Sequence, residues 1–199
     1  GVVGFSQTVD EKTAQHLMST NIKTIIAVDY SEKALQILKE KPFVKLVKLN
    51  TNLKEIQEIV GTNLVSTHFG LLVQTQNKPV LNQKTCKIVS KVKPATEQIE
   101  DTVFGWKIAK HLKTHCAVVV KDLNVVGVSQ GSLSLISATE EALKVACENA
   151  KDAVLVTNGV IDSKDVIFQA VQNRIATVVQ SGISKTDLEI IKTVDKYSL

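Results

Sequence analysis

Short runs of β-branched residues alternate with helical patterns along most of this chain, and this alternation limits its fold more than any other feature. Thr24–Val28 and Ala153–Val156 are two such runs, and each is followed, after a polar connection, by apolar residues at helical spacing. Strands that alternate with helices form a largely parallel sheet covered by helices on both faces. The sequence therefore predicts an α/β fold.

The full set of predicted elements follows the same alternation. Strands are expected at Val2–Phe5, Thr24–Val28, Val44–Leu49, His68–Gln74, Lys87–Val92, Cys116–Val120, Val125–Val128, Ala153–Val156 and Ala176–Val179. Helices are expected from Asp10 to near Asn21, from a Ser31 cap through Leu38, and at Leu53–Val60, Thr96–Lys113, Lys164–Gln172 and Ser184–Asp195, with one more opened by a Ser137-x-x-Glu140 capping box. Turns are expected at Asn77–Pro79 and Lys121–Asn124.

One stretch of the chain is echoed by another. Thr24–Lys39 and Thr177–Lys192 share a Thr, a Ser, a Leu, an Ile and a Lys at matching places, and each runs from a strand pattern into a helical one. Strand–loop–helix units converge on such patterns by themselves, and two related lobes would also produce the match. We take Gly1–Val92 (residues 1–92) and Lys93–Leu199 (residues 93–199) as two lobes.

The composition of the chain limits the kinds of ligand and macromolecule that it is expected to bind. Of the 24 basic residues only Arg174 is an arginine, the residue whose planar guanidinium binds carboxylates and phosphates in bidentate fashion. The lysines are interspersed with 20 acidic residues and only 4% of the chain is aromatic, so nucleic acid is not an expected partner.

Localisation is predicted from what the sequence lacks. Three widely spaced cysteines favour a reducing compartment, and we expect a cytoplasmic protein. There is no apolar run of the roughly 18 residues that a membrane helix needs and no secretory leader, so no membrane association is expected. The chain starts with Gly1 rather than Met, which indicates a processed or cut polypeptide.

Familiar catalytic motifs are incomplete in this sequence. His111 and His115 have no HExxH acid between them, and His115–Cys116 lacks the further residues of a zinc deaminase, so no metal site is expected. Gly127-Val-Ser-Gln-Gly131 has the G-x-S-x-G spacing, but no histidine follows Ser129 in the chain, so a hydrolase triad is not expected.

Two small-residue loops are the better candidates for a binding site. Ser129–Ser134 precedes a predicted helix and can present backbone N–H groups to an anion. Gln180-Ser-Gly-Ile-Ser184 connects a predicted strand to a helix and could cradle a phosphate, although a plain connection has the same composition.

An ordered series of motifs resembles a known family. Lys93-Pro-Ala-Thr-Glu97, Phe104-Gly-Trp-Lys107 and Lys110-His-Leu-Lys-Thr-His-Cys-Ala117 are similar to the transformylase part of the bifunctional proteins that combine AICAR formyltransferase with IMP cyclohydrolase in purine biosynthesis. Gly1-Val-Val-Gly-Phe5 and Phe69-Gly-Leu-Leu-Val-Gln74 continue the resemblance toward the start of the chain.

The resemblance implies a fold and a reaction. The fold is a pair of three-layer α/β/α, cytidine-deaminase-like lobes with mostly parallel or mixed sheets. The reaction is formyl transfer from 10-formyltetrahydrofolate, a co-substrate rather than a covalently bound cofactor, to the amine of AICAR in a homodimer. Such a reaction needs a positioned base and an oxyanion stabiliser. The family's lysine–histidine pair supplies the base and lies ahead of the segment matched by Gly1, so we expect this chain alone to lack it.

Departures from the family concentrate in the ligand-binding motifs. The asparagine of its lysine–serine–asparagine–alanine motif is His115, which is the one candidate for a substitute base. The arginines of its glycine–glutamine–x–serine–arginine loop and of the segment after its glutamine–proline–glycine–glycine–serine turn are Leu135 and Thr186. By correspondence with the family, the candidate substrate-binding residues are His115, Gly131, Ser132, Ser134, Asn158, Gln180, Ser181 and Gly182.

Two functions follow from the resemblance and its departures. In the first, the chain is a divergent AICAR formyltransferase that binds a nucleotide or a folate and is inactive alone. In the second, it is a transformylase-like binding or scaffolding protein, or a dimer partner, without catalysis.

Overall fold

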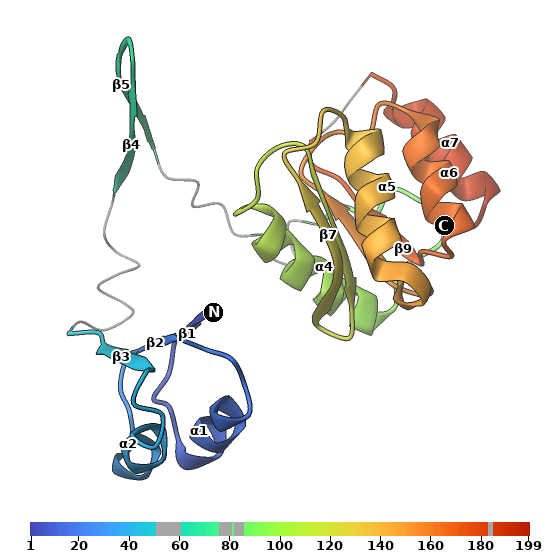
Figure 1. Cartoon of the computed structure of the whole chain (residues 1–199). Helices are drawn as coiled ribbons and strands as arrows, with labels where there is room; N and C mark the ends of the chain where they lie inside the picture. Colours follow the sequence, from blue (N-terminus) through green and yellow to red (C-terminus); the bar gives the residue numbers. More distant parts are fainter. Residues whose placement is uncertain (51–60, 76–80, 82–85, 183–184) are drawn as a thin grey trace. The chain divides into compact units, whose positions relative to one another are not determined.

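The computed structural model describes residues 1–50, 61–75, 81, 86–182 and 185–199 (Figure 1). The chain forms two compact units, Gly1–Gln76 and Asn77–Leu199. The sequence prediction divided the lobes later, after Val92. Residues just before that point contact the second unit, where the Lys91 N–H donates to Asp195 Oδ1 at 2.8 Å. The predicted helix Leu53–Val60 and turn Asn77–Pro79 lie outside the described residues.

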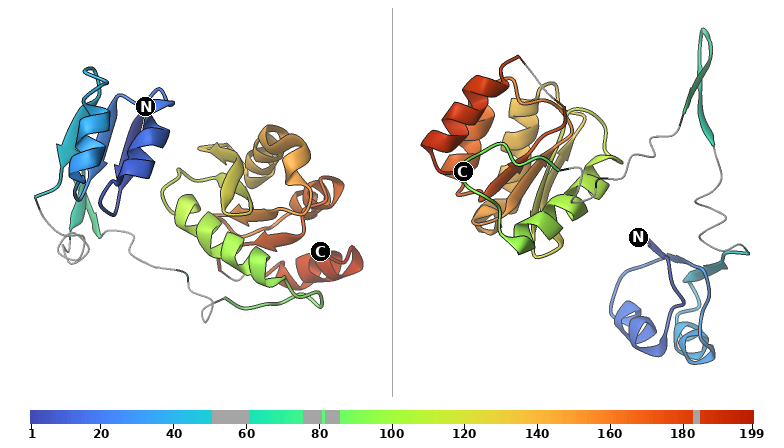
Figure 2. Two further views of the ribbon diagram at one scale, coloured as in Figure 1. Left: turned by 90° about the horizontal axis from the view of Figure 1, so that it is seen from below. Right: turned by 180° about the vertical axis from the view of Figure 1, so that it is seen from behind.

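The first unit contains a small parallel sheet. Strands β1 (Val2–Phe5), β2 (Thr24–Ala27) and β3 (Lys45–Lys48) pair in that order, and α1 (Glu11–Met18) and α2 (Glu32–Leu38) connect them. The two helices contact each other (Figure 2). Parallel strands that are added one after another on the same side of a sheet, by right-handed connections, place their connecting helices on one face of that sheet. A buried cluster that includes Ile25 and Leu38 lies between helices and sheet.

The sequence predicted both helix starts of this unit. Asp10 caps α1 by accepting the Thr13 N–H at 2.8 Å, and Ser31 caps α2 by accepting the Ala34 N–H at 3.2 Å. These contacts satisfy backbone donors that the first helical turn leaves unpaired.

An antiparallel hairpin follows, and here the strand prediction was wrong. Strands β4 (Thr62–Thr67) and β5 (Gly70–Thr75) pair around a turn at His68 and Phe69, so the predicted strand His68–Gln74 begins two residues too early and β4 was missed. Gly70 adopts a φ of 134°, which residues with a Cβ rarely adopt. Lys87–Val92 is described but forms no strand.

The second unit is a three-layer α/β/α sandwich, as predicted. Its sheet has the order β7-β6-β8-β9, in which β6 is antiparallel to β7 and β8, and β8 is parallel to β9. The mixed sheet agrees with the expected fold class. The elements are α4 (Thr96–Ala109), β6 (Cys116–Lys121), β7 (Asn124–Gln130), α5 (Leu135–Ala146), a 3-10 helix (Cys147–Ala150), β8 (Val154–Thr157), α6 (Lys164–Gln172), β9 (Thr177–Val179) and α7 (Asp187–Lys196).

Alternation along the buried strands produces the two covered faces. Val118 and Val120 of β6 pack in a cluster with the side of α4, whereas Ala117 and Val119 pack in a cluster with α5 and α6. Successive side chains of a strand point to opposite faces, so a continuous run of buried residues is what a sheet between two helical layers requires.

The start of α5 differs from the prediction. Ser134, and not Ser137, is the N-cap, because its Oγ accepts the Ser137 N–H at 3.1 Å. Leu135 and Ala138 are both buried, so the apolar face of the helix begins before the predicted capping box. The wrong start came from a Ser-x-x-Glu pattern that lies within the helix.

The predicted Lys121–Asn124 turn is present and has a buried anchor. Asp122 and Leu123 adopt φ values of 52° and 57°. The carboxylate of Asp101, which is only 6% exposed, accepts both of their N–H groups, at 3.0 and 2.7 Å.

Both members of the sequence echo form a strand followed by a helix, β2 with α2 and β9 with α7, which either explanation of the echo predicts.

Candidate functional site

One edge of the second sheet collects all of the predicted binding residues. Strands β7, β8 and β9 end at this edge, and β6 begins there because it runs opposite to the others. Helices α5 and α6 start just beyond it. The carboxyl edge of an open α/β sheet is the usual place for a ligand. The residues brought to it are His115, Gly131, Ser132, Ser134, Asn158, Gln180, Ser181 and Gly182.

His115 lies beside the loop after β7. Its backbone pairs with Ser132 in both directions, at 3.4 and 3.2 Å, which holds the residue before β6 against the loop after β7. The ring atom Nδ1 is buried and has no hydrogen-bond partner. A Cβ added at Gly159 would lie 3.8 Å from this atom, and 3.9 Å from Leu135 Cδ2, so the imidazole faces the turn after β8.

Asn158 uses both ends of its amide within the protein. Its Oδ1 accepts the Cys116 N–H at 3.0 Å, and its Nδ2 donates to Thr114 Oγ1 at 3.1 Å. The side chain therefore ties the end of β8 to the start of β6. Burial raises the pKa of the Cys116 thiol, which keeps this cysteine protonated and unreactive at neutral pH.

The serines of the next loop are tied to a carboxylate that the sequence analysis missed. Ser129 Oγ donates to Glu141 Oε2, and Ser132 Oγ donates to the same oxygen at 3.0 Å. These two hydrogen bonds hold the pKa of Glu141 below its usual value, and the bond from Ser129 has the larger effect. Ser134 Oγ is occupied as the cap of α5. The sequence analysis missed Glu141 because it began α5 too late. With the helix starting at Leu135, Glu141 lies about two turns along α5 and is a candidate partner for the loop that precedes the helix.

Gly131 shapes the same loop. It adopts a φ of 70°, and its N–H donates to the Lys113 carbonyl at 2.9 Å. This left-handed conformation favours glycine and turns the chain back toward α5.

The loop after β9 carries the last three candidate residues. Gln180 Oε1 accepts the Ile161 N–H at 2.7 Å, and its Nε2 donates to Asp187 Oδ1 at 3.1 Å, so both ends of this amide are also occupied. Gly182 has a φ of 77°. Ser181 is half-buried between them. Asp187, at the start of α7, is a second polar partner that the sequence analysis missed.

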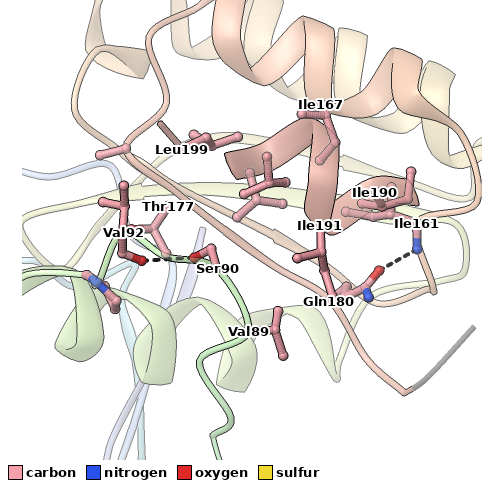
Figure 3. Close-up of a pocket in the computed structure, with 14 residues that line it drawn as sticks. Val89, Ser90, Val92, Ile161, Ile167, Thr177, Gln180, Ile190, Ile191 and Leu199 are labelled. Atoms are coloured by element: carbon pink, nitrogen blue, oxygen red, sulfur yellow. Dashed lines mark hydrogen bonds between the residues drawn. The ribbon is translucent and has the colours of Figure 1, made fainter. Parts of the chain in front are cut away.

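A cavity of about 90 Å³ adjoins Gln180 (Figure 3). Its walls come from the segment before α4, the β8–α6 connection, α6, β9 and α7, and most are aliphatic, among them Val89, Ile161 and Ile190. The cavity does not reach His115, Ser132 or Asn158, so among these edge residues it contacts only Gln180.

No arginine is available to bind an anion at this edge, although Lys113 and Lys164 lie close to it. The single arginine, Arg174, comes before β9 and thus lies toward the opposite end of that strand. Among the described residues, no three His, Cys, Asp or Glu side chains are grouped to hold a metal ion. No helix within the described ranges is long and apolar enough to cross a bilayer.

Comparison with known proteins gives a consistent relationship. A family model described as the AICARFT/IMPCHase bienzyme matches residues 1–145. Bifunctional purine biosynthesis protein PurH of Thermoanaerobacter sp. (strain X514) is 34% identical over 196 residues, which are 98% of this chain and 38% of that protein. The proteins of the same name from Fusobacterium nucleatum and Dictyostelium discoideum are 32% and 30% identical, each over 100% of this chain and 38% of their own length. The chain thus spans well under half of these relatives.

Proposed function

Because the chain belongs to the AICARFT/IMPCHase bienzyme family, we propose that it is a transformylase-type protein of purine biosynthesis that does not transfer formyl groups on its own. Its relatives are bifunctional purine biosynthesis proteins. Under this proposal the chain keeps the α/β framework of a formyl-transferring protein, and its sheet edge is a weak binding surface for AICAR or a folate.

One observation carries the proposal: the polar side chains at the edge are already bonded within the protein. Both ends of the Asn158 and Gln180 amides have partners, and two serines share the Glu141 carboxylate. A ligand that uses one of these groups must displace an internal hydrogen bond. Leaving a buried donor unpaired costs about 1–3 kcal/mol, whereas a typical new hydrogen bond returns only about 0.5–1.5 kcal/mol.

The missing arginines weaken anion binding further. The family resemblance places arginines where this chain has Leu135 and Thr186. A charge-assisted bond from a guanidinium contributes about 1.5–3 kcal/mol, and leucine supplies no donor at all. The Glu141 carboxylate near the same loop repels a phosphate or a carboxylate.

A catalytic alternative rests on His115. Its unpartnered Nδ1 is at the edge, and imidazole is a general base of suitable strength near neutral pH. In this alternative the chain transfers the formyl group from 10-formyltetrahydrofolate, and His115 accepts the proton that the amine loses as it attacks.

Titration calorimetry with AICAR, and separately with a folate analogue, tests both readings. We expect no binding tighter than about 1 mM, which corresponds to only about 4 kcal/mol. His115→Asn restores the family residue and should leave this result unchanged. Micromolar binding, or formyl transfer that is lost in His115→Asn, would refute the non-catalytic proposal.

A further inference from the structure

Two serine hydroxyls converge on one carboxylate oxygen beside β7, which is an edge strand of the second sheet. Ser129 Oγ and Ser132 Oγ both donate to Glu141 Oε2, the second at 3.0 Å, and the two hydroxyl oxygens lie 2.9 Å apart. A hydroxyl has a single proton, so both protons are directed at the same carboxylate oxygen. The serines therefore form a two-donor site for an oxyanion, and Glu141 is the anion that fills it.

The donors of this site are held more firmly than the carboxylate. Ser129 belongs to β7 and is 7% exposed, and Ser132 is fixed by backbone hydrogen bonds with His115 at 3.4 and 3.2 Å. Glu141 is an exposed residue about two turns along α5. A long exposed side chain loses rotamer freedom when it is held in place, and this loss offsets part of its hydrogen-bond energy. The serines are thus preorganised, and the carboxylate is the part that can leave.

A positively charged side chain lies next to the same loop. Lys113 is exposed, and its Cβ lies 3.9 Å from the position that a Cβ on Gly131 would occupy. Its ammonium group is carried on a flexible stem, so it can approach an anion that the loop binds. A free oxyanion held by the two hydroxyls can therefore gain a charge-assisted contact with Lys113 as well.

We propose that Glu141 is an internal competitor at this site: its carboxylate takes the place of an oxyanion and must leave the two serines before a phosphate or a carboxylate of a ligand binds there. The inference rests on the proposed function, because it takes the loop after β7 as part of the binding surface, and it adds the contact that keeps this surface weak. A tethered group has a high effective concentration, so it excludes a free anion even when each hydrogen bond is modest.

Titration of the full chain with inorganic phosphate, and separately with acetate, followed by amide NMR at neutral pH, tests the proposal. Glu141→Ala removes the competing carboxylate and frees both hydroxyls, and α5 should persist because alanine is the best helix former. We expect this variant to bind phosphate at least about tenfold more tightly than the parent, since each freed hydroxyl donates a hydrogen bond to a charged group. The signals that move should be those of Ser129, Ser132 and their neighbours. A gain with either anion supports the proposal, and the larger gain identifies the ligand group.

Two control variants separate occupation of the serines from simple repulsion. Glu141→Gln removes the negative charge but keeps an amide oxygen that can accept both hydroxyls. Glu140→Ala removes the same charge from the neighbouring position of α5, which points about 100° away around the helix. Both controls should gain much less affinity than Glu141→Ala, and adding Ser132→Ala to Glu141→Ala should cancel most of the gain.

The absence of a gain in Glu141→Ala, or an equal gain in all three single variants, would overturn the proposal. The comparison uses free anions and variants of the chain, whereas the proposed function is tested by titrating the parent with AICAR and a folate analogue. Failure of the internal competition would therefore leave the result for the parent unaffected, and tight binding of AICAR by the parent would refute the proposed function whatever the variants do.

Discussion

Gly127→Ala should destabilise the second unit strongly, because α5 packs directly on this glycine. A Cβ at position 127 would overlap the carbonyl oxygen of Ala142 and lie 2.9 Å from the Cβ of Ala146, both in α5. Neither atom is the end of a flexible side chain, so the helix itself must move. Overpacking of a core costs about 1–3 kcal/mol, and a backbone clash belongs at the upper end of that range.

A smaller gain partly offsets this cost. Alanine loses less conformational entropy than glycine on folding, by roughly 0.5–1 kcal/mol. The expected net loss is about 2 kcal/mol. The same displacement of α5 would disturb the Ser134 cap and the contact of Glu141 with the serine loop, so the effect should reach the candidate site.

Fluorescence of Trp106 during urea unfolding is the suitable assay. It is the only tryptophan of the chain and lies on α4, so its signal reports the second unit alone. Gly159→Ala is the control, because its added Cβ would make only ordinary contacts, at 3.8 and 3.9 Å. If Gly127→Ala unfolds at the same urea concentration as Gly159→Ala, the packing argument is refuted.

Two further substitutions test local features of the second unit. Leu123→Gly should stabilise it by up to about 1 kcal/mol, because the strain energy of a leucine at a φ of 57° exceeds the entropic free energy that a glycine loses on folding. Thermal melting checks this, with Leu133→Gly as the control at a fully exposed leucine that lacks the strain. Glu141→Gln should lower stability at neutral pH and cease to matter in acid. The lowered pKa of Glu141 means that its stabilisation is present above the ordinary glutamate pKa and disappears as the pH falls through the folded value. Parallel pH profiles of the two melting temperatures would contradict this.

Local patterns in the sequence were enough to predict most helices and the buried strands. Lys164–Gln172 forms α6 with the predicted bounds, because its Ser163 cap and apolar spacing agree. Val118 and its neighbours in β6 form a continuous apolar run that only a sheet with two covered faces accommodates. The cap and the apolar spacing of α6, and the apolar run of β6, each lie within about a dozen consecutive residues. The tertiary contacts of these elements favour the same structures as the local patterns do.

Features that depend on distant residues could not be predicted in the same way. The hairpin turn at His68 depends on how β4 pairs with β5, and apolar residues alone do not set that register. The position of the α5 cap depends on which serine faces the helix end. The predicted site residues do lie together at one edge of the second sheet, but the partners that occupy the Asn158 and Gln180 amides and the serine hydroxyls beside Glu141 come from 7 to 44 residues away along the chain.

The occupied amides decide how a ligand could bind at this edge. To engage Asn158, a ligand must take its Oδ1 from the Cys116 N–H, and to engage Gln180 it must take the Oε1 from the Ile161 N–H. Each exchange replaces one hydrogen bond by another and returns little net free energy. His115 Nδ1 has no hydrogen-bond partner, but the atom is buried, so a ligand can reach it only if the surrounding loops move. Backbone groups of the three loops are therefore the main source of affinity left to this edge, and His115→Asn is the substitution that shows whether the imidazole adds to it.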